Sequence, residues 1–218
     1  GPRQRGKDAM KLYYSAGSCS TSCHITLEEA GLRYEAIEVD WDKPGDLTKL
    51  VAELNPLGTL PVFHTDDGKQ LDQNIAIHVY AADRAPAKNL LPPAGTLERA
   101  QALNWLSFVA ADLHKAIGGM FSIPSISEDK GVQAAVRTWM AGRANDHLQY
   151  VEQKLGGNDY LMGKQFTPAD AYAFVVINWT KYLDIPLAPY KNIQAYLGRI
   201  AARPAVQRVL KAEGLLEE

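Results

Sequence analysis

Cys19 is the residue whose type and position best suit chemistry in this chain of 218 residues. It follows the turn Ala16-Gly17-Ser18 at the end of a predicted first strand, where a helix is expected to begin. Free backbone N–H groups and the positive end of a helix dipole stabilise a thiolate there, so the sequence predicts a thiol of lowered pKa. The alternative is an inert cysteine packed beneath the turn. Hydroxyl groups that can donate to the sulfur surround it: Ser18, Ser20, Thr21 and Ser22.

Cys23 and His24 lie one helical turn beyond Cys19. A disulfide between residues i and i+4 of one continuous helix has poor geometry, so we expect Cys23 to lie in the core. The three residues form a C-x3-C-H cluster, but no second pair of ligands follows at zinc-finger spacing. We therefore expect no metal at this cluster.

Two further segments offer backbone or amide groups to a ligand. Thr59-Leu60-Pro61 begins a predicted strand, where proline is tolerated and a cis bond would turn the preceding backbone toward a ligand, although the sequence leaves the isomer open. Gln73 and Asn74 begin a predicted helix, where side-chain amides and helix-terminal N–H groups suit a carboxylate. Simple helix capping explains these two residues equally well.

His114 differs from the other histidines because Leu113 precedes it and Lys115 follows it on a predicted helix. A histidine and a cation therefore leave that helix together. The sequence identifies no partner for the remaining four, which are expected at the surface or in the core: His24, His64, His78 and His147.

The elements that must position Cys19 alternate between strand and helix up to about residue 84. Asp66-Asp67-Gly68 is a strong hairpin signal between two short β-prone runs. The predicted order is β-α-β-α-β-β-α, an α/β unit. Its elements are strand 11–15, helix 19–30 ending at Gly31, strand 34–39, a helix after Pro44 that stops at 55–58, strands 59–65 and 69–71, and helix 74–84.

The second half shows no clear strand signal and is predicted to be all-helical. Thr167-Pro168-Ala169-Asp170 predicts a capped helix that is apolar nearly all round and therefore buried. The predicted helices are 96–117, 132–155, 171–183, 193–202 and 205–212. We expect a tail at 1-9, either a cloning remnant or native, a first domain at 10-86, a linker at 87-95 and a helical domain at 96-218.

The composition is that of an ordinary globular protein, with 46% hydrophobic and 22% charged residues. A formal net charge of −2 provides no excess of positive charge for nucleic acid or an anionic membrane, so neither is an expected partner. No apolar run approaches the roughly 20 residues that cross a bilayer. Two cysteines are too few for a disulfide framework, which indicates a reducing, cytoplasmic compartment.

Five motifs stand out along the chain: MKLYYSAGSCS at 10–20, NPLGTLP at 55–61, the Asp66-Asp67-Gly68 hairpin with 71–77 after it, Leu113-His114-Lys115, and FTPADAY at 166–172. In this order and spacing they resemble the motifs of bacterial beta-class glutathione S-transferases. The resemblance covers the chain from Met10 to near its end and implies a thioredoxin-like domain, then a helical domain, in a homodimer that uses glutathione as co-substrate.

The resemblance also implies roles for individual residues. Cys19 looks like the active-site cysteine, which contacts the glutathione sulfur and can form a mixed disulfide with it, and Leu60 would pair with the cysteinyl backbone before a cis Pro61. Gln73 and Asn74 fall where the γ-glutamyl end is held. His114 matches a residue facing the thiol, which makes it the second catalytic candidate. The other residues implied to contact glutathione are Tyr14, Lys43, Thr59, Ser107, Ala111, Asp112, Leu113 and Lys115.

The chain departs from the family pattern at several positions. Glutamate is usual where Gln73 stands, and its loss removes a charge-assisted contact with the glutathione ammonium, on the order of 1–3 kcal/mol, or about tenfold to a hundredfold in affinity. Ala16, Ser18 and Ser107 replace the usual proline, alanine and asparagine.

Two functions follow from these residues. The first is conjugation of glutathione to a small electrophile held between the two domains. The same pocket can also serve thiol-disulfide or peroxide reduction through Cys19. The alternative is a non-catalytic dimeric protein that binds apolar ligands on the same fold.

Overall fold

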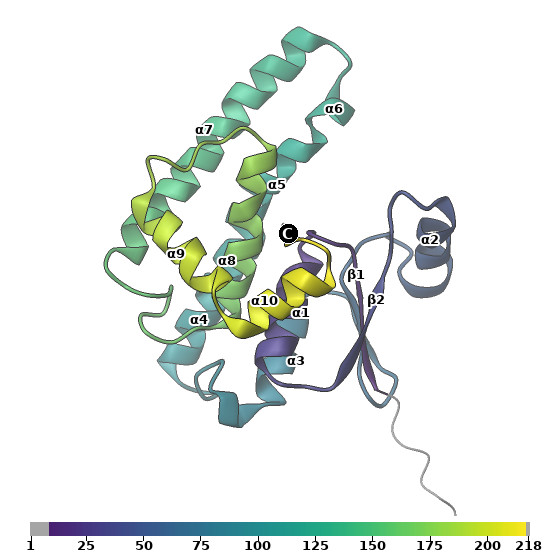
Figure 1. Ribbon diagram of the computed structural model, residues 1–218. Coiled ribbons are helices and arrows are strands. Elements are labelled where there is room, and N and C mark those ends of the chain that lie inside the picture. The colour runs from purple at the N-terminus through teal and green to yellow at the C-terminus, as the bar shows by residue number, and fades with distance from the viewer. Residues whose placement is uncertain (1–8, 217–218) are drawn as a thin grey trace, which may run out of the picture. The chain divides into compact units, whose positions relative to one another are not determined.

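The computed structural model describes residues 9–216, so the predicted tail 1-9 lies, apart from Ala9, outside the described residues. The chain divides into two compact units, both of which are drawn in Figure 1. The first consists of Gly1–Asn89 with Ala205–Glu218, and the second of Leu90–Pro204. The predicted domain 96-218 therefore differs at its C-terminal end, because residues from Ala205 onward group with the first unit.

The first unit is built on a four-stranded mixed sheet in the order β2-β1-β3-β4. Its strands are β1 (Met10–Tyr14), β2 (Tyr34–Glu38), β3 (Val62–His64) and β4 (Gln70–Leu71). β1 is parallel to β2 and antiparallel to β3, which forms the predicted hairpin with β4. Gly68 has a φ of 81°, a conformation that suits glycine, in the turn of that hairpin.

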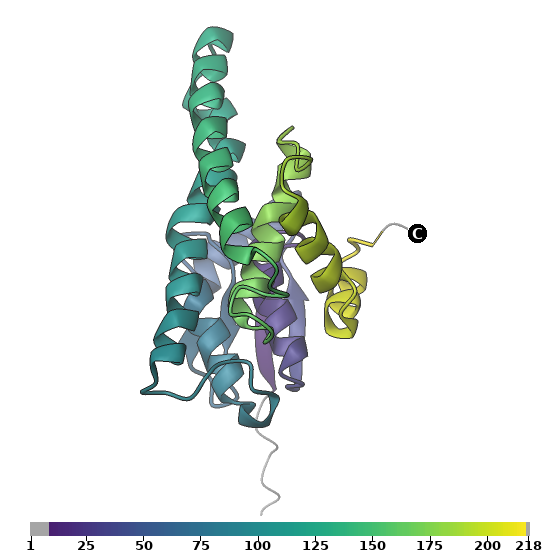
Figure 2. The ribbon, with the colours of Figure 1, turned by 90° about the vertical axis from the view of Figure 1, so that its left-hand side faces the viewer.

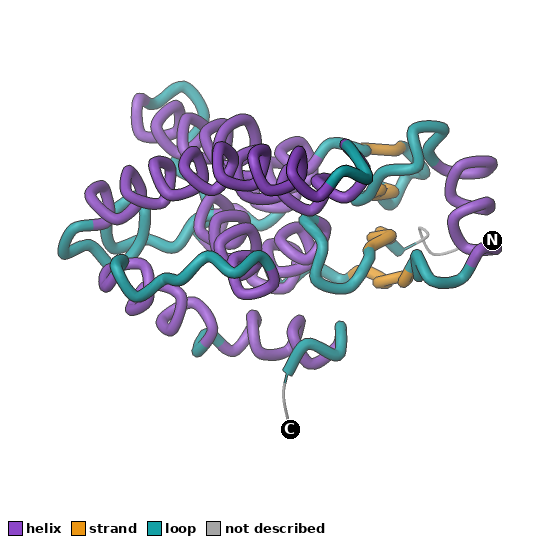
Figure 3. Tube along the Cα trace, turned by 90° about the horizontal axis from the view of Figure 1, so that it is seen from above, coloured by secondary structure: helices purple, strands orange, loops and turns teal. Residues whose placement is uncertain are grey.

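Helices cover both faces of this sheet. α1 (Ser20–Glu29) and α3 (Asn74–Asp83) lie side by side on one face, while α2 (Pro44–Lys49) lies on the other (Figures 1 and 3). A π-helical turn, η1 (Leu50–Leu54), continues α2, and a short 3-10 helix, η2 (Pro86–Lys88), follows α3. The main core, beneath α1 and α3, contains Leu12, Cys23, Leu27, Phe63 and Ile77, all completely buried. This arrangement confirms the predicted thioredoxin-like unit.

The last helix, α10 (Pro204–Ala212), lies beside α1. Arg208 Nε donates to Glu28 Oε1 over 2.7 Å at the surface. This contact, together with the contacts of Glu213 described below, explains why the C-terminal segment groups with the sheet and not with the helical unit.

The second unit is all-helical, as predicted. Its major helices are α4 (Leu97–Phe108), α7 (Lys130–Leu155), α8 (Pro168–Asn178) and α9 (Lys191–Ala201). Figure 2 shows the long α7. The single helix predicted for 96–117 is interrupted by a π-helical turn, η3 (Val109–Leu113), before α5 (His114–Gly118). Two short elements were not predicted: η4 (Gly119–Ser122) and α6 (Ile123–Ile126). The helix predicted for 171–183 ends as a 3-10 helix, η5 (Trp179–Tyr182).

Helix α8 is the buried centre of this unit, which confirms the sequence prediction. Ten of its eleven residues are buried, and Thr167 with Asp170 forms the predicted capping box. Asp170 is completely buried and accepts hydrogen bonds from Thr167 N, Leu161 N and the Tyr196 hydroxyl, at 2.9, 2.9 and 2.6 Å. Burial raises the pKa of Asp170 to about 6, against the effect of these donors. The carboxylate thus joins the start of α8, the preceding loop and α9.

Within the described part of the chain, no helix combines the length and the apolar composition needed to cross a membrane.

Candidate active site

Cys19 is the N-cap residue of α1, as the sequence predicts, and is half-buried. Its thiol donates to the carbonyl oxygen of Leu60 over 3.4 Å. The Leu60-Pro61 peptide bond is cis, which the sequence left open. Cys19, the candidate nucleophile, therefore lies next to Leu60, the candidate backbone partner of a peptide ligand, although they are 41 positions apart in the chain.

Asn74 holds the turn of Cys19 from the first residue of α3. Its Nδ2 donates to the carbonyl oxygen of Cys19 over 3.0 Å and to Ser22 Oγ over 3.2 Å. Because a carbonyl oxygen can only accept, these contacts fix the orientation of the amide. Asn74 Oδ1 is then buried without a hydrogen-bond partner in the part of the chain that the structure describes. Gln73, the N-cap residue of α3, is exposed.

The predicted lowering of the Cys19 pKa is wrong for the free protein. Burial raises the pKa of the Cys19 thiol to about 11, although the Asn74 side chain and the backbone N–H groups of Cys19 and Ser20 lower it. The donors at the helix start that stabilise an anion could be identified from the sequence, but the desolvation of the thiol could not. Here desolvation has the larger effect on the Cys19 pKa. The Cys19 thiol of the free protein is therefore protonated at neutral pH.

We expect the alkylation rate of Cys19 in the free protein to continue to rise with pH through pH 9 and 10, because the thiolate is the reacting form. Iodoacetamide labelling, with the Cys19 peptide followed by mass spectrometry, measures this rate. The Cys19→Ser variant controls for other reacting groups. A rate that levels off near pH 7 would show instead that the thiol is already ionised.

A buried histidine on α3 contacts the helix that follows the turn of Cys19. His78 is completely buried against α1, with Nε2 3.1 Å from Ser22 Oγ and Nδ1 2.7 Å from Thr26 Oγ1. Ser22 Oγ in turn donates to the carbonyl oxygen of Cys19 over 2.6 Å. Burial lowers the pKa of His78 to about 3, so this ring remains neutral and its role is structural.

Glu213 fixes the loop before Cys19 from the far end of the chain. Its completely buried carboxylate accepts from Gly17 N over 3.1 Å and from Thr21 Oγ1 over 2.6 Å, and its Oε2 lies 2.7 Å from His24 Nδ1. Sequence reasoning missed Glu213, since its partners lie at least 189 residues away and no local pattern marks it.

Three other predicted contact residues of this unit lie at different depths. Tyr14 is buried, with its ring 5.3 Å from that of His24. Lys43 is the exposed N-cap residue of α2, and Thr59 is exposed, with its carbonyl oxygen accepting from Asn55 Nδ2 over 2.9 Å. Within residues 9–216, the hydrogen-bond partners of Cys19 are Leu60, Ser22 and Asn74, and not these three residues.

The predicted residues of the helical unit lie at the end of α4, along η3 and at the start of α5. His114 Nδ1 is 2.6 Å from the Tyr172 hydroxyl, and burial, followed by the neighbouring Lys115, lowers the His114 pKa. Leu113 is completely buried in the core, so its prediction as a ligand contact is not supported. The other residues predicted here are exposed: Ser107, Ala111, Asp112 and Lys115.

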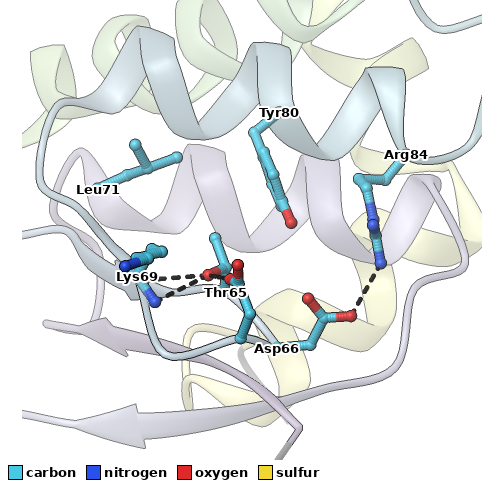
Figure 4. A pocket seen from close by; sticks show the side chains of 7 residues that line it. Thr65, Asp66, Lys69, Leu71, Tyr80 and Arg84 are labelled. Atoms are coloured by element: carbon cyan, nitrogen blue, oxygen red, sulfur yellow. Dashed lines mark hydrogen bonds and ion pairs between the residues drawn. The ribbon is translucent and has the colours of Figure 1, made fainter. Parts of the chain in front are cut away.

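A pocket of about 450 Å³ lies at the β3–β4 hairpin (Figure 4). In Figure 4, Tyr80 and Arg84 point from α3 toward the hairpin, where Arg84 pairs with Asp66 over 3.0 Å. None of the predicted site residues is among the described residues that line it: Thr65, Asp66, Asp67, Lys69, Leu71, Tyr80 and Arg84. A second pocket, of about 400 Å³, includes the predicted contact residue Asp112 with Phe108, Asp146, His147 and Tyr150.

Cys19 and Cys23 are both free thiols. Over residues 9–216, no group of three or more histidine, cysteine, aspartate or glutamate side chains is arranged to hold a metal ion.

Comparison with known proteins supplies the family context of these residues. A family model described as the N-terminal domain of glutathione S-transferases matches residues 16–84, and one described as the C-terminal domain matches residues 111–213. The protein named glutathione S-transferase GstA of Escherichia coli O157:H7 is 36% identical over 210 residues, covering 94% of this chain and 100% of that protein.

Two solved structures agree with this. A sphingomonad glutathione S-transferase complexed with glutathione has a TM-score of 0.81 at 36% identity, and a beta-class glutathione S-transferase of Sphingomonas chungbukensis has a TM-score of 0.84 at 34% identity. Each comparison covers 94% of this chain and 100% of the solved one. These similarities confirm the resemblance that the motifs indicated.

Proposed function

Because the chain belongs to the glutathione S-transferase family, we propose that it conjugates glutathione to small electrophiles. We further propose that Cys19 gives it glutathione-dependent thiol-disulfide or peroxide reductase activity. Glutathione is then the co-substrate, and the protein works as a homodimer, as the resemblance implies. The two free thiols agree with a reducing compartment, and we assign the protein to the cytoplasm.

The observation that carries this proposal is the 3.4 Å contact between the Cys19 thiol and the carbonyl oxygen of Leu60. A peptide whose backbone pairs with Leu60 brings its own side chain close to Cys19. For glutathione this side chain is a thiol, so the two sulfur atoms would meet at the start of α1. Gln73 and Asn74, at the start of α3, can then hold the γ-glutamyl end. His114 and Lys115 are proposed to act on the same ligand.

In the conjugation reaction the nucleophile is the glutathione sulfur. Its proton leaves to solvent, and the backbone N–H groups of Cys19 and Ser20 are placed to stabilise the resulting thiolate. The thiolate attacks the electrophile and displaces its leaving group. Cys19 need not ionise in this reaction, which agrees with its raised pKa.

In thiol exchange the nucleophile is Cys19 itself. After losing its proton, its sulfur attacks one sulfur of a disulfide, so that one new S–S bond forms and the other half leaves as a thiolate. A glutathione thiolate then attacks the substrate sulfur of this mixed disulfide, forming a disulfide between glutathione and that group, and Cys19 leaves as a thiolate and regains its proton. Because the Cys19 pKa is raised in the free protein, we expect this activity to increase with pH.

The Gln73→Glu variant is expected to bind glutathione about tenfold to a hundredfold more tightly, since a carboxylate forms a charge-assisted contact with the ammonium group. Isothermal titration calorimetry on both proteins measures the difference. The matched control is Gln153→Glu, which makes the same change at an exposed position of α7. Equal affinities of the unaltered protein and Gln73→Glu would remove Gln73 from the glutathione site.

The alternative function, a non-catalytic protein that binds apolar ligands, predicts a different result. It requires that immobilised glutathione fail to retain the protein and that neither an aryl halide nor a hydroperoxide be turned over. Two observations favour this alternative: residue 73 is a neutral glutamine, and the Cys19 thiol is protonated at neutral pH.

A further inference from the structure

The ring of His114 is held on several sides within the helical unit. Its centroid lies 4.9 Å from that of Trp179 and 5.7 Å from that of Tyr172, both in edge-to-face arrangements. Gly118 lies one turn further along α5, where an added Cβ would come within 3.0 Å of His114 Cδ2 and 2.9 Å of Trp179 Cζ3. The close packing at Gly118 and the two aromatic rings therefore restrict the rotation of the imidazole.

The hydrogen bond between His114 and Tyr172 determines which ring nitrogen carries the proton. His114 Nδ1 and the Tyr172 oxygen are 2.6 Å apart, a separation more typical of an O–H donor than of an N–H donor. A phenol is a stronger acid than a neutral imidazole, and the imidazole nitrogen is the stronger acceptor. The hydroxyl therefore donates to Nδ1.

Tyr172 is buried in a position from which its hydroxyl can fix the tautomer of His114. It is 2% exposed and lies on α8, the buried central helix, so its hydroxyl has little freedom to move away from His114. Burial lowers the His114 pKa, with Lys115 adding to the effect, so the ring is neutral at neutral pH. A neutral imidazole that accepts at Nδ1 has its only proton on Nε2.

We propose that Tyr172 is a positioning residue for His114, holding its imidazole in the neutral tautomer that presents an Nε2–H donor. His114 then supplies a hydrogen bond to an anionic group such as a thiolate, and its Nε2 cannot act as a general base. The proposal rests on the proposed function for the identity of that group. The tautomer itself is a property of this chain alone.

Nitrogen-15 NMR of the full-length protein, labelled at histidine, tests the tautomer directly. The His114→Gln variant assigns the His114 signals among those of the five histidines. We expect an unprotonated Nδ1 and a protonated Nε2 in the unaltered protein, and a mixture of both tautomers in Tyr172→Phe. The matched control is Tyr190→Phe, which removes the hydroxyl of another buried tyrosine of this unit, one that bonds Asn145 Oδ1 over 2.6 Å.

Kinetics test the consequence. Tyr172→Phe is expected to lower kcat/KM for conjugation about fivefold to tenfold, the loss typical of one hydrogen bond. Added to His114→Gln, it should cause less than about a twofold further loss, because it acts through His114. Tyr190→Phe should leave the rate unchanged.

A proton on Nδ1 in the unaltered protein, or His114 signals that Tyr172→Phe does not change, would overturn the proposal. Full additivity of the two variants would overturn it as well, since Tyr172 would then act independently of His114. Absence of any glutathione turnover in the unaltered protein would defeat the proposed function, and the NMR spectra would still decide the tautomer.

Discussion

Cys19→Ala is expected to lower glutathione-dependent disulfide reduction by at least about 10³-fold while conjugation is retained. In thiol exchange the Cys19 sulfur forms the mixed disulfide, and alanine cannot replace it. In conjugation the glutathione sulfur attacks, and the backbone N–H groups at the start of α1 remain. The measurement compares turnover of a mixed disulfide with turnover of an aryl halide in the same preparations.

Cys23→Ala is the matched control for that experiment. Cys23 is the other free cysteine, lies one helical turn further along α1 and is completely buried. We expect this variant to retain both activities. If Cys19→Ala reduced both activities to the same extent, the cysteine would instead be required to activate or position the glutathione thiol, and the separation into two reactions would be wrong.

Asp170→Ala is expected to destabilise the protein by about 3–5 kcal/mol. The substitution removes the acceptor of four buried donors: Thr167 N, Thr167 Oγ1, Leu161 N and the Tyr196 hydroxyl. It also removes the capping box of α8, on which the core of the helical unit depends. Urea unfolding followed by circular dichroism measures the change.

The control for this variant is Asp129→Ala at the exposed start of α7. Asp129 accepts from Val132 N over 2.9 Å, and its loss should destabilise by only about 1 kcal/mol, as for an ordinary helix cap. Equal effects of the two substitutions would show that burial of the Asp170 carboxylate adds nothing to its capping role.

Local signals in the sequence were sufficient to predict much of the fold. The hairpin turn at Asp66-Asp67-Gly68, the cap at Thr167 and the start of α1 beside Cys19 depend on residues a few positions apart, and the structure has all three. The π-helical turn of η3 interrupts a pattern that reads equally well as one continuous helix, so it left no detectable signal.

The surroundings of the candidate site could not be predicted in the same way. The raised Cys19 pKa depends on burial produced by packing, while the groups that bond the residue, Leu60 and Asn74, are 41 and 55 positions away. Glu213 and its loop partners are separated by nearly the whole chain. Tyr172 belongs to a motif that the sequence singled out, but its contact with His114 requires two helices to pack together.

A crystal structure of the protein with glutathione tests the central claim most directly. We expect the cysteinyl backbone of glutathione to pair with Leu60 and its sulfur to lie within hydrogen-bonding or covalent reach of Cys19 Sγ. A complex in which Cys19 Sγ still bonds only to the protein while glutathione occupies another site, or a crystal that takes up no glutathione, would contradict the account.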